Sequence, residues 1–229
     1  MDDKTFDDQK TALEWISSVE SEKGRIRDGD IYPRLKNWVN HASPKEILEI
    51  GAGQGICSDK IDLDGRNYTG LEPSPLLVDR ANELYHHENR RFLLGNAYTL
   101  PFSDGVFDAA FSVAVWHLLS DIQKAAIELS RVLKTNGHFL IITANPNAYS
   151  LWTDLYTDSK FDGRRFDGKV RHDDNSVSHD VLYLHTFDEI VSSLQAASLK
   201  IQATETFRTS EKSKGQQYFI SIRGQKLLS

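Results

Sequence analysis

The sequence predicts an α/β fold in which helices cover both faces of one largely parallel sheet. From Lys45 onward, short apolar runs alternate with amphipathic helical stretches, the pattern typical of such a sheet. Residues 47–55 form an apolar run that ends in three glycines at alternating positions, which indicates a buried strand that turns sharply into a helix. No linker, repeat or low-complexity tract divides the 229 residues, so we expect a single domain over 1–229.

Helix and strand signals alternate in order along the middle of the chain. Three helices are expected here. The first covers 55–61, and the second begins at the N-cap pair Ser74–Pro75. The third begins at a capping box of Ser120 and Gln123 and ends at Asn136–Gly137. The five strands expected between these helices are 46–50, 67–72, 91–94, 106–115 and 138–143.

The C-terminal part predicts one more helix and an edge pair of strands. Thr186 and Glu189 form a second capping box. The runs 200–207 and 217–223 alternate apolar with polar residues, which is typical of antiparallel strands at a sheet edge.

Two segments lie outside this alternation. Residues 1–43 carry apolar residues at helical spacing and predict two helices that cover the sheet or its ligand. Residues 145–185 show no clear element, although Tyr149, Trp152 and Tyr156 could share a helical face. Forty residues exceed an ordinary connection, so we expect a lid-like, substrate-binding insertion.

Composition restricts the classes of partner. A net charge of -6 argues against a nucleic acid or an anionic membrane as the main partner. Cys57 is the only cysteine, so no disulfide forms within the chain and a reducing compartment is expected. The acidic N-terminus is no signal peptide, and no apolar run approaches the ~20 residues that span a bilayer. We therefore expect a cytoplasmic protein.

The spacing of the glycines restricts the ligand. A dinucleotide fingerprint requires Gly-x-Gly-x-x-Gly, but its third glycine is replaced here by Ile56, and no phosphate-binding P-loop sequence is present. Glu72 ends the second expected strand, about twenty residues after the turn, where a carboxylate can accept hydrogen bonds from ribose hydroxyls. A ligand with a ribose but without a pyrophosphate is indicated.

Four segments in order resemble class I S-adenosylmethionine-dependent methyltransferases. Their likeness is to the acid-x-Gly-x-Gly-x-Gly motif, the second-strand motif, the "LPF…FD" region of the small-molecule (type 11-like) branch, and the "R-x-L-K-P-G-G" segment. In this chain they are Glu49–Gly55, Tyr68–Ser74, Leu100–Phe102 with Phe107–Asp108, and Arg131–Lys134 with Gly137. The resemblance covers residues 45–145 and the C-terminal helix and strand pair in outline.

The resemblance implies a Rossmann-like, doubly wound sheet of order 3-2-1-4-5-7-6 with the last strand antiparallel. It also implies S-adenosylmethionine as cofactor, with the glycines against its methionine part, Glu72 on the ribose and residues 96–97 at the adenine. Asn96 stands where the family commonly has Asp, and its side-chain carbonyl would accept from the adenine amino group. The implied cofactor residues are Glu49, Gly51, Ala52, Gly53, Glu72, Pro73, Asn96, Ala97 and Val113.

Methyl transfer from a sulfonium needs mainly an in-line nucleophile, so a catalytic residue is not obligatory. Where a base is needed, histidine suits by its near-neutral pKa. His117, after the fourth strand, and His185, before the last helix, are the candidates; packing roles are the alternative for both. Asn145-Pro146-Asn147-Ala148-Tyr149 is unlike the family's amino-methylating Asn/Asp-Pro-Pro-Tyr motif, because it follows the fifth strand and lacks the second proline.

Aromatic residues suggest the acceptor wall: Tyr32 in the N-terminal cover, and Tyr149 and Trp152 in the insertion. Aromatic residues at helical spacing also occur in ordinary cores, so this alternative stays open. His172 and His179 lie near several aspartates but fit no familiar metal spacing, and no metal site is expected.

The sequence thus predicts methyl transfer to O, N or C of a small molecule by a monomer or homodimer. A cofactor-binding protein without transfer activity and a protein methyltransferase are the alternatives.

Overall fold

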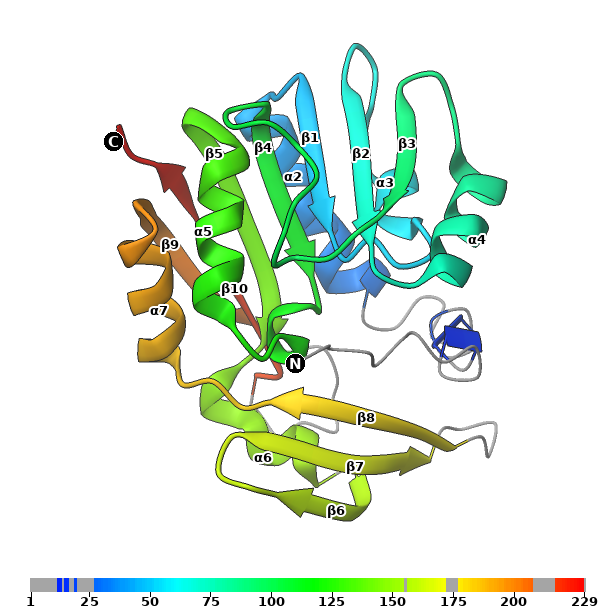
Figure 1. Cartoon of the computed structure of the whole chain (residues 1–229), viewed down its shortest axis with the longest axis vertical. Helices are drawn as coiled ribbons and strands as arrows, with labels where there is room; N and C mark the ends of the chain where they lie inside the picture. Colours follow the sequence, from blue (N-terminus) through cyan, green and yellow to red (C-terminus); the bar gives the residue numbers. More distant parts are fainter. Residues whose placement is uncertain are drawn as a thin grey trace.

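A computed structural model describes residues 12–13, 15–16, 19, 27–154, 156–171, 177–207 and 217–228. Its centre is a seven-stranded sheet of order β3-β2-β1-β4-β5-β10-β9 (Figure 1). The five strands from β3 to β5 run parallel, and β10 pairs antiparallel with both β5 and β9. This confirms the predicted order. The strands are β1 Glu46–Ile50, β2 Asn67–Glu72, β3 Arg90–Leu94, β4 Phe107–Val113, β5 Leu133–Ala144, β9 Leu199–Phe207 and β10 Phe219–Lys226.

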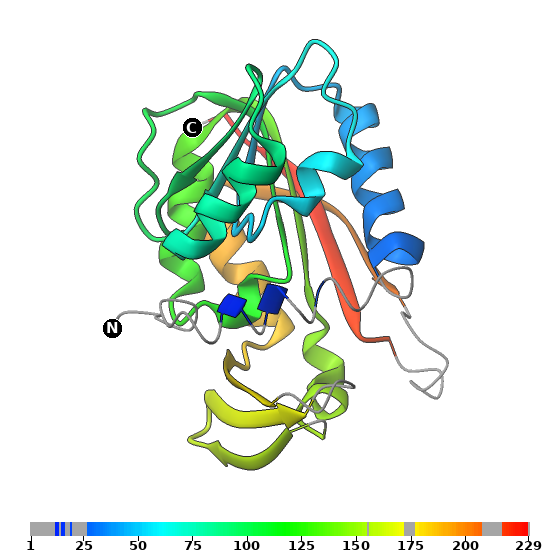
Figure 2. The same cartoon turned by 90° about the vertical axis from the view of Figure 1, so that its right-hand side faces the viewer.

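Helices pack on both faces of this sheet, and Figure 2 shows α2 and α5 on opposite sides. One apolar cluster joins one face to α2 (Tyr32–Ala42), α3 (Ile56–Lys60) and α4 (Pro75–Tyr85). The second cluster joins the other face to α5 (Ile122–Val132) and α7 (Phe187–Ala196). Central strands are therefore buried on both faces, which explains their unbroken apolar runs. None of the described helices is long and apolar enough to cross a bilayer.

Short helical turns connect these elements at the edge where β1, β4 and β5 end. They are η1 (Arg27–Ile31) before α2, η2 (Trp116–Leu118) after β4, and η3 (Pro146–Ala148) after β5. Helix α2 confirms the second helix predicted within 1–43. The first predicted helix falls largely outside the described residues, of which 12–13, 15–16 and 19 are helical.

Both ends of α5 differ from the prediction. Asp121, not Ser120, is the N-cap, and its carboxylate accepts the N–H of Lys124. Ser120 instead contacts the hydroxyl of Tyr98 through its own hydroxyl and its N–H. The helix ends at Val132 because its last carbonyls accept N–H groups from the chain that enters β4: Gly105 donates to Arg131, and Val106 to Val132. Strand β5 consequently starts at Leu133, five residues earlier than predicted.

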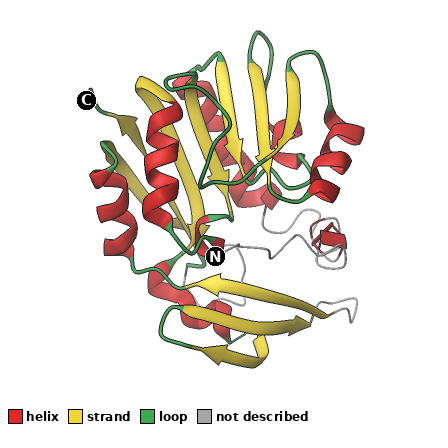
Figure 3. Cartoon of the chain, in the orientation of Figure 1, coloured by secondary structure: helices red, strands yellow, loops and turns green. Residues whose placement is uncertain are grey.

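Residues 145–185 contain regular structure that the sequence did not predict. After η3 and α6 (Tyr149–Thr153) come β6 (Tyr156–Phe161), β7 (Arg165–Arg171) and β8 (Val177–Tyr183), which form a separate antiparallel sheet of order β6-β7-β8 (Figure 3). Tyr156 therefore does not share a helix with Tyr149 and Trp152; it opens β6 and donates its hydroxyl to Asp180. We call α6 with β6–β8 the insertion. It lies beyond the carboxyl ends of the parallel strands (Figure 1).

Candidate functional site

The glycine turn after β1 is fixed to the end of β2. The N–H groups of Gly51 and Ala52 both donate to the carbonyl of Leu71, at 2.8 and 3.0 Å. Gly51, Gly53 and Gly55 all have positive φ, between 54° and 87°, a region that L side chains rarely adopt. A Cβ on Gly51 would lie 2.3 Å from a methyl of Val115. The turn therefore needs glycine for its backbone and for close packing of the chain that leaves β4.

Glu72 lies beside this turn, as the sequence predicted. One carboxylate oxygen accepts the N–H of Gly53 at 3.0 Å, and the other accepts the N–H of Ser74 at 3.1 Å. The side chain is 4% exposed, and burial raises the pKa of Glu72 to about 7 against these two donors. Each oxygen keeps a second lone pair, so Glu72 can accept further hydrogen bonds from a ligand.

A second buried carboxylate lies under the turn. Glu49 on β1 accepts hydrogen bonds from the Tyr68 hydroxyl on β2 and from the Cys57 thiol on α3. Burial raises the pKa of Glu49 to about 8, with the charge of Glu72 as a further cause. Two carboxylates with raised pKa values therefore flank one turn, an arrangement that a bound cation would stabilise.

Two further residues at the turn were missed by the sequence reasoning. Gln54 is buried, and its side-chain oxygen has no hydrogen-bond partner in the described part of the chain. Arg27 lies over the ring of Trp15 at 5.2 Å and hydrogen-bonds to the Tyr32 hydroxyl. The positive charge of Arg27 also lowers the pKa of Glu49. Gln54 lies within the glycine motif Glu49–Gly55, whereas no signal in the sequence placed Arg27 near the turn.

The segment after β4 brings His117 to the same edge of the sheet. Val113 ends β4 in a buried position, and Ala114 then adopts φ 60°, an uncommon value for a residue with a side chain. His117 is buried, with Nδ1 3.0 Å from the hydroxyl of Thr143 on β5. Its ring lies 5.9 Å from that of Trp152 in α6. Burial lowers the pKa of His117 to about 4, and His185 contributes, so the imidazole is neutral at physiological pH.

His185 connects the insertion to the main sheet. Its Nε2–H donates to the carbonyl of Leu119 at 2.6 Å, and its Nδ1 faces the guanidinium of Arg164 at 3.3 Å. Arg164 is in turn ion-paired with Glu189, the capping-box residue of α7. The Tyr149 hydroxyl contacts the backbone of His185. Both ring nitrogens of His185 are therefore occupied, which favours a positioning role over a role as base.

The predicted acceptor wall is only partly assembled. Tyr149 and Trp152 lie in α6 close to the two histidines, and the Trp152 indole donates to the carbonyl of Tyr218 at 3.1 Å. Tyr32 lies instead at the start of α2, with Arg27 and Lys60 against it. Tyr32 thus borders the glycine turn rather than the other two aromatic residues.

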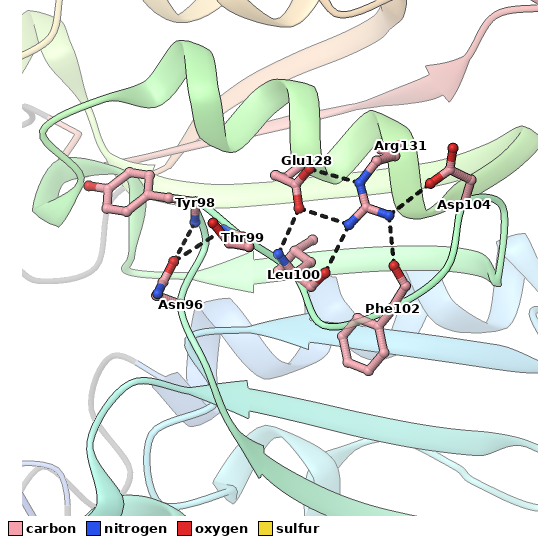
Figure 4. Close-up of polar contacts among 8 residues, drawn as sticks. All are labelled: Asn96, Tyr98, Thr99, Leu100, Phe102, Asp104, Glu128 and Arg131. Atoms are coloured by element: carbon pink, nitrogen blue, oxygen red, sulfur yellow. Dashed lines mark hydrogen bonds and ion pairs between the residues drawn. The ribbon is translucent and has the colours of Figure 1, made fainter.

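The predicted adenine segment, Asn96 and Ala97, forms a tight turn after β3. The side-chain oxygen of Asn96 accepts the N–H groups of Tyr98 and Thr99 at 2.9 and 3.2 Å (Figure 4). The side-chain oxygen that was expected to accept a hydrogen bond from the adenine amino group therefore already has two donors. Only the amide NH2 of this exposed residue remains for a ligand. Ala97 is buried in the core, whereas Pro73 beside Glu72 is exposed.

Arg131 on α5 holds the loop that follows this turn. Its guanidinium is paired with Glu128 and Asp104 and donates to the carbonyls of Leu100 and Phe102 at 2.8 and 2.7 Å (Figure 4). The Glu128 carboxylate accepts the N–H of Leu100 at 2.7 Å. The "LPF" and "R-x-L-K" segments thus act as one hydrogen-bonded unit that shapes the loop between β3 and β4.

The described residues hold no cluster of three or more potential metal ligands. His179 pairs with Asp167 in the insertion. His172, Asp173 and Asp174 lie outside the described residues.

Comparison with known proteins shows which proteins this chain is similar to. Residues 48–141 match the family model described as methyltransferase domain. An uncharacterized methyltransferase of Bacillus subtilis is 34% identical over 99 residues, which are 42% of this chain and 39% of that protein. The phthiotriol/phenolphthiotriol dimycocerosates methyltransferase of Mycobacterium leprae is 27% identical over 143 residues, or 62% of this chain and 52% of that protein. The matched domain and these relatives support a class I S-adenosylmethionine-dependent methyltransferase.

Solved structures of S-adenosylmethionine-dependent methyltransferases share the fold at low identity. A methyltransferase from Clostridium acetobutylicum superposes with a TM-score of 0.70 at 13% identity, over 94% of this chain and 99% of that one. One from Methanosarcina mazei gives 0.67 at 23% identity, over 87% and 100%. The curated relatives named above are matched over about half of their length or less.

Proposed function

We propose that this chain transfers the methyl group of S-adenosylmethionine to a small-molecule acceptor. The observation that carries the proposal is the glycine turn, held by backbone hydrogen bonds against the end of β2, with Glu72 buried beside it. In open α/β sheets, ligands bind beyond the carboxyl ends of the strands, where strand order reverses. Here that point lies between β1 and β4.

The residues at this edge fit the cofactor. Glu72 would accept hydrogen bonds from ribose hydroxyls, and the buried oxygen of Gln54, which has no partner among the described residues, would accept one from an amino group. Arg27 supplies a cation for a carboxylate, and the buried Glu49 favours a cationic ligand. The bound cofactor would supply an activated methyl group on a sulfonium. Gly53 has no side chain, and a Cβ at this position would lie 3.5 Å from the indole nitrogen of Trp15.

The Asn96 turn calls for a different adenine contact from the one first expected. With its oxygen taken by two N–H groups, the Asn96 amide is placed to donate through NH2. An adenine ring nitrogen is a suitable acceptor for such a donor. The expected carbonyl contact would require this turn to open.

For the acceptor, the aromatic residues that the insertion brings close to His117 favour a small molecule. Trp152 and Tyr149 come from α6, and His117 from η2. Relatives that the chain matches in part include a fatty-acid O-methyltransferase of Mycolicibacterium smegmatis and a demethylmenaquinone methyltransferase of Tropheryma whipplei. Both names describe small-molecule acceptors, which favours the same class here over a protein substrate.

The test is formation of S-adenosylhomocysteine by the purified chain with labelled methyl donor. We expect turnover with a metabolite extract and none with a protein lysate cleared of small molecules. Glu72→Ala should abolish turnover and weaken cofactor binding on the order of 100-fold, as expected for loss of two charged hydrogen bonds. The matched control is Glu83→Ala, an exposed glutamate on α4. Label in protein but not in metabolites would contradict the proposal.

A further inference from the structure

The hydrogen bonds of His117 bear on which class of methyl acceptor the site can use. Each hydrogen bond that His117 makes with the described part of the chain is at Nδ1. The Thr143 hydroxyl lies 3.0 Å from this nitrogen, and the backbone N–H of Ala144 donates to it at 3.5 Å. A backbone N–H is always a donor, so Nδ1 must be an acceptor. The proton of the neutral ring is therefore on Nε2, and His117 presents an N–H donor rather than a base.

His185, the neighbour whose charge acts on His117, has partners at both ring nitrogens. His185 donates through Nε2–H to Leu119, while its Nδ1 faces the Arg164 guanidinium. Glu189 is paired with Arg164, and Asp121, which also acts on His185, caps α5. Burial raises the pKa of Tyr149. Among the described residues, the two carboxylates that act on His185 are thus engaged, one in an ion pair and one in a helix cap.

From this arrangement we infer that the acceptor atom is an oxygen that is already anionic when it enters, of the carboxylate class, and that His117 positions it by donating from Nε2. This inference rests on the proposed methyl transfer. An alcohol or an ammonium acceptor would have to give up a proton to a base, whereas a carboxylate needs none.

The resulting step balances without proton transfer. One carboxylate oxygen forms a bond to the methyl carbon while the carbon–sulfur bond of the sulfonium donor breaks, and that electron pair stays on sulfur. The carboxylate charge and the sulfonium charge cancel, so the products are a neutral methyl ester and a thioether. Throughout, the Nε2–H of His117 holds the acceptor, and Thr143 with the Ala144 N–H keeps the ring in the required tautomer.

Matched acceptors of one carbon skeleton test the chemical class. Purified chain with S-[methyl-³H]adenosylmethionine is offered decanoate, decanol and decylamine, then phenylacetate, 2-phenylethanol and phenethylamine, and finally a metabolite extract. Methyl esters release labelled methanol in mild alkali, whereas ethers and methylamines do not. We expect label that is alkali-labile, from carboxylates or from the extract. Alkali-stable label would overturn the inference.

A second measurement does not depend on finding the acceptor. Nitrogen-15 spectra of the histidine rings, assigned with His117→Phe, report which nitrogen carries the proton. We expect the Nε2–H tautomer for His117 without titration from pH 5.5 to 8. A Nδ1–H tautomer, or titration near neutral pH, would overturn the inference. Failure of the underlying methyl transfer is distinguishable, because it would show as absence of S-adenosylmethionine binding by calorimetry.

Variants separate positioning from packing. His117→Phe keeps a ring but removes the donor, and we expect kcat/KM for the acceptor to fall on the order of 10- to 100-fold with cofactor affinity unchanged. His117→Gln retains an N–H donor and should recover part of this loss at every pH. If both variants lose kcat/KM equally, and the pH profile of the unaltered protein follows the titration of the His117 ring, His117 acts as a base and the inference is contradicted.

Discussion

The two halves of the site are built differently. The glycine-turn half consists of backbone hydrogen bonds and buried carboxylates within β1, β2 and the residues between them. The insertion half is connected by side chains that are distant in sequence, such as His185 to Leu119 and Trp152 to Tyr218. The first half thus depends on local sequence, and the second on tertiary contacts. This difference predicts that variants in the two halves should affect different steps.

The largest effect is expected at the glycine turn. Gly53→Asp places a side chain and a negative charge against Trp15 and the ligand surface, so S-adenosylmethionine affinity should fall at least 100-fold. Gly65→Asp is the matched control: its φ of 66° carries the same backbone strain, but nothing lies within 4 Å of its Cβ position. Calorimetry of both variants makes the comparison. Equal loss in both would show that backbone strain, not the ligand surface, decides the result.

The next effect is the pH dependence of stability. Glu49 and Glu72 have folded-state pKa values raised to about 8 and about 7 from 4.5. A raised carboxyl pKa contributes stability that is complete below pH 4.5 and is lost as pH rises through the folded value. Between pH 6.5 and 8.5 the ligand-free protein should lose about 2 kcal/mol through Glu49. Glu49→Gln should remove that part of the loss, as measured by urea unfolding at both pH values; an unchanged slope would count against a neutral Glu49.

Arg131 tests whether the loop between β3 and β4 is held as one unit. Arg131→Met removes the hydrogen bonds to the carbonyls of Leu100 and Phe102 and the ion pair with Glu128. We expect a loss of about 1.5 kcal/mol in the free energy of unfolding and weaker cofactor binding. Arg223→Met, at an exposed position on β10, should change stability by less than about 0.5 kcal/mol. Similar losses in the free energy of unfolding for both variants would mean that the Arg131 network contributes little to stability.

The smallest effect on the cofactor is expected from the insertion half. His185→Ala removes the link from the insertion to Leu119, so turnover should fall on the order of tenfold, equivalent to about 1.4 kcal/mol. Cofactor affinity should stay constant, and amide exchange in β7 and β8 should accelerate. His87→Ala, an exposed histidine beside β3, serves as control. A fall in cofactor affinity would contradict the separation of the halves.

The sequence predicted the fold of the glycine-turn half well because its signals are local. Strand order, the turn and Glu72 followed from apolar runs, glycine spacing and a resemblance over 45–145 that the family match at 48–141 supports. The end of α5 was wrong because the chain entering β4 takes up its last carbonyls. The sheet β6–β8 was missed because its short, charged strands are stabilised by pairing with each other. Arg27 was missed because only the fold brings η1 to the turn.

We propose that the turn at 51–55, with Glu72, binds S-adenosylmethionine and not a dinucleotide. Calorimetric titration of the purified chain with S-adenosylmethionine, and separately with NAD⁺, tests it most directly. We predict saturable binding of one S-adenosylmethionine per chain and no binding of NAD⁺. Saturable NAD⁺ binding, or no measurable S-adenosylmethionine binding, would contradict it.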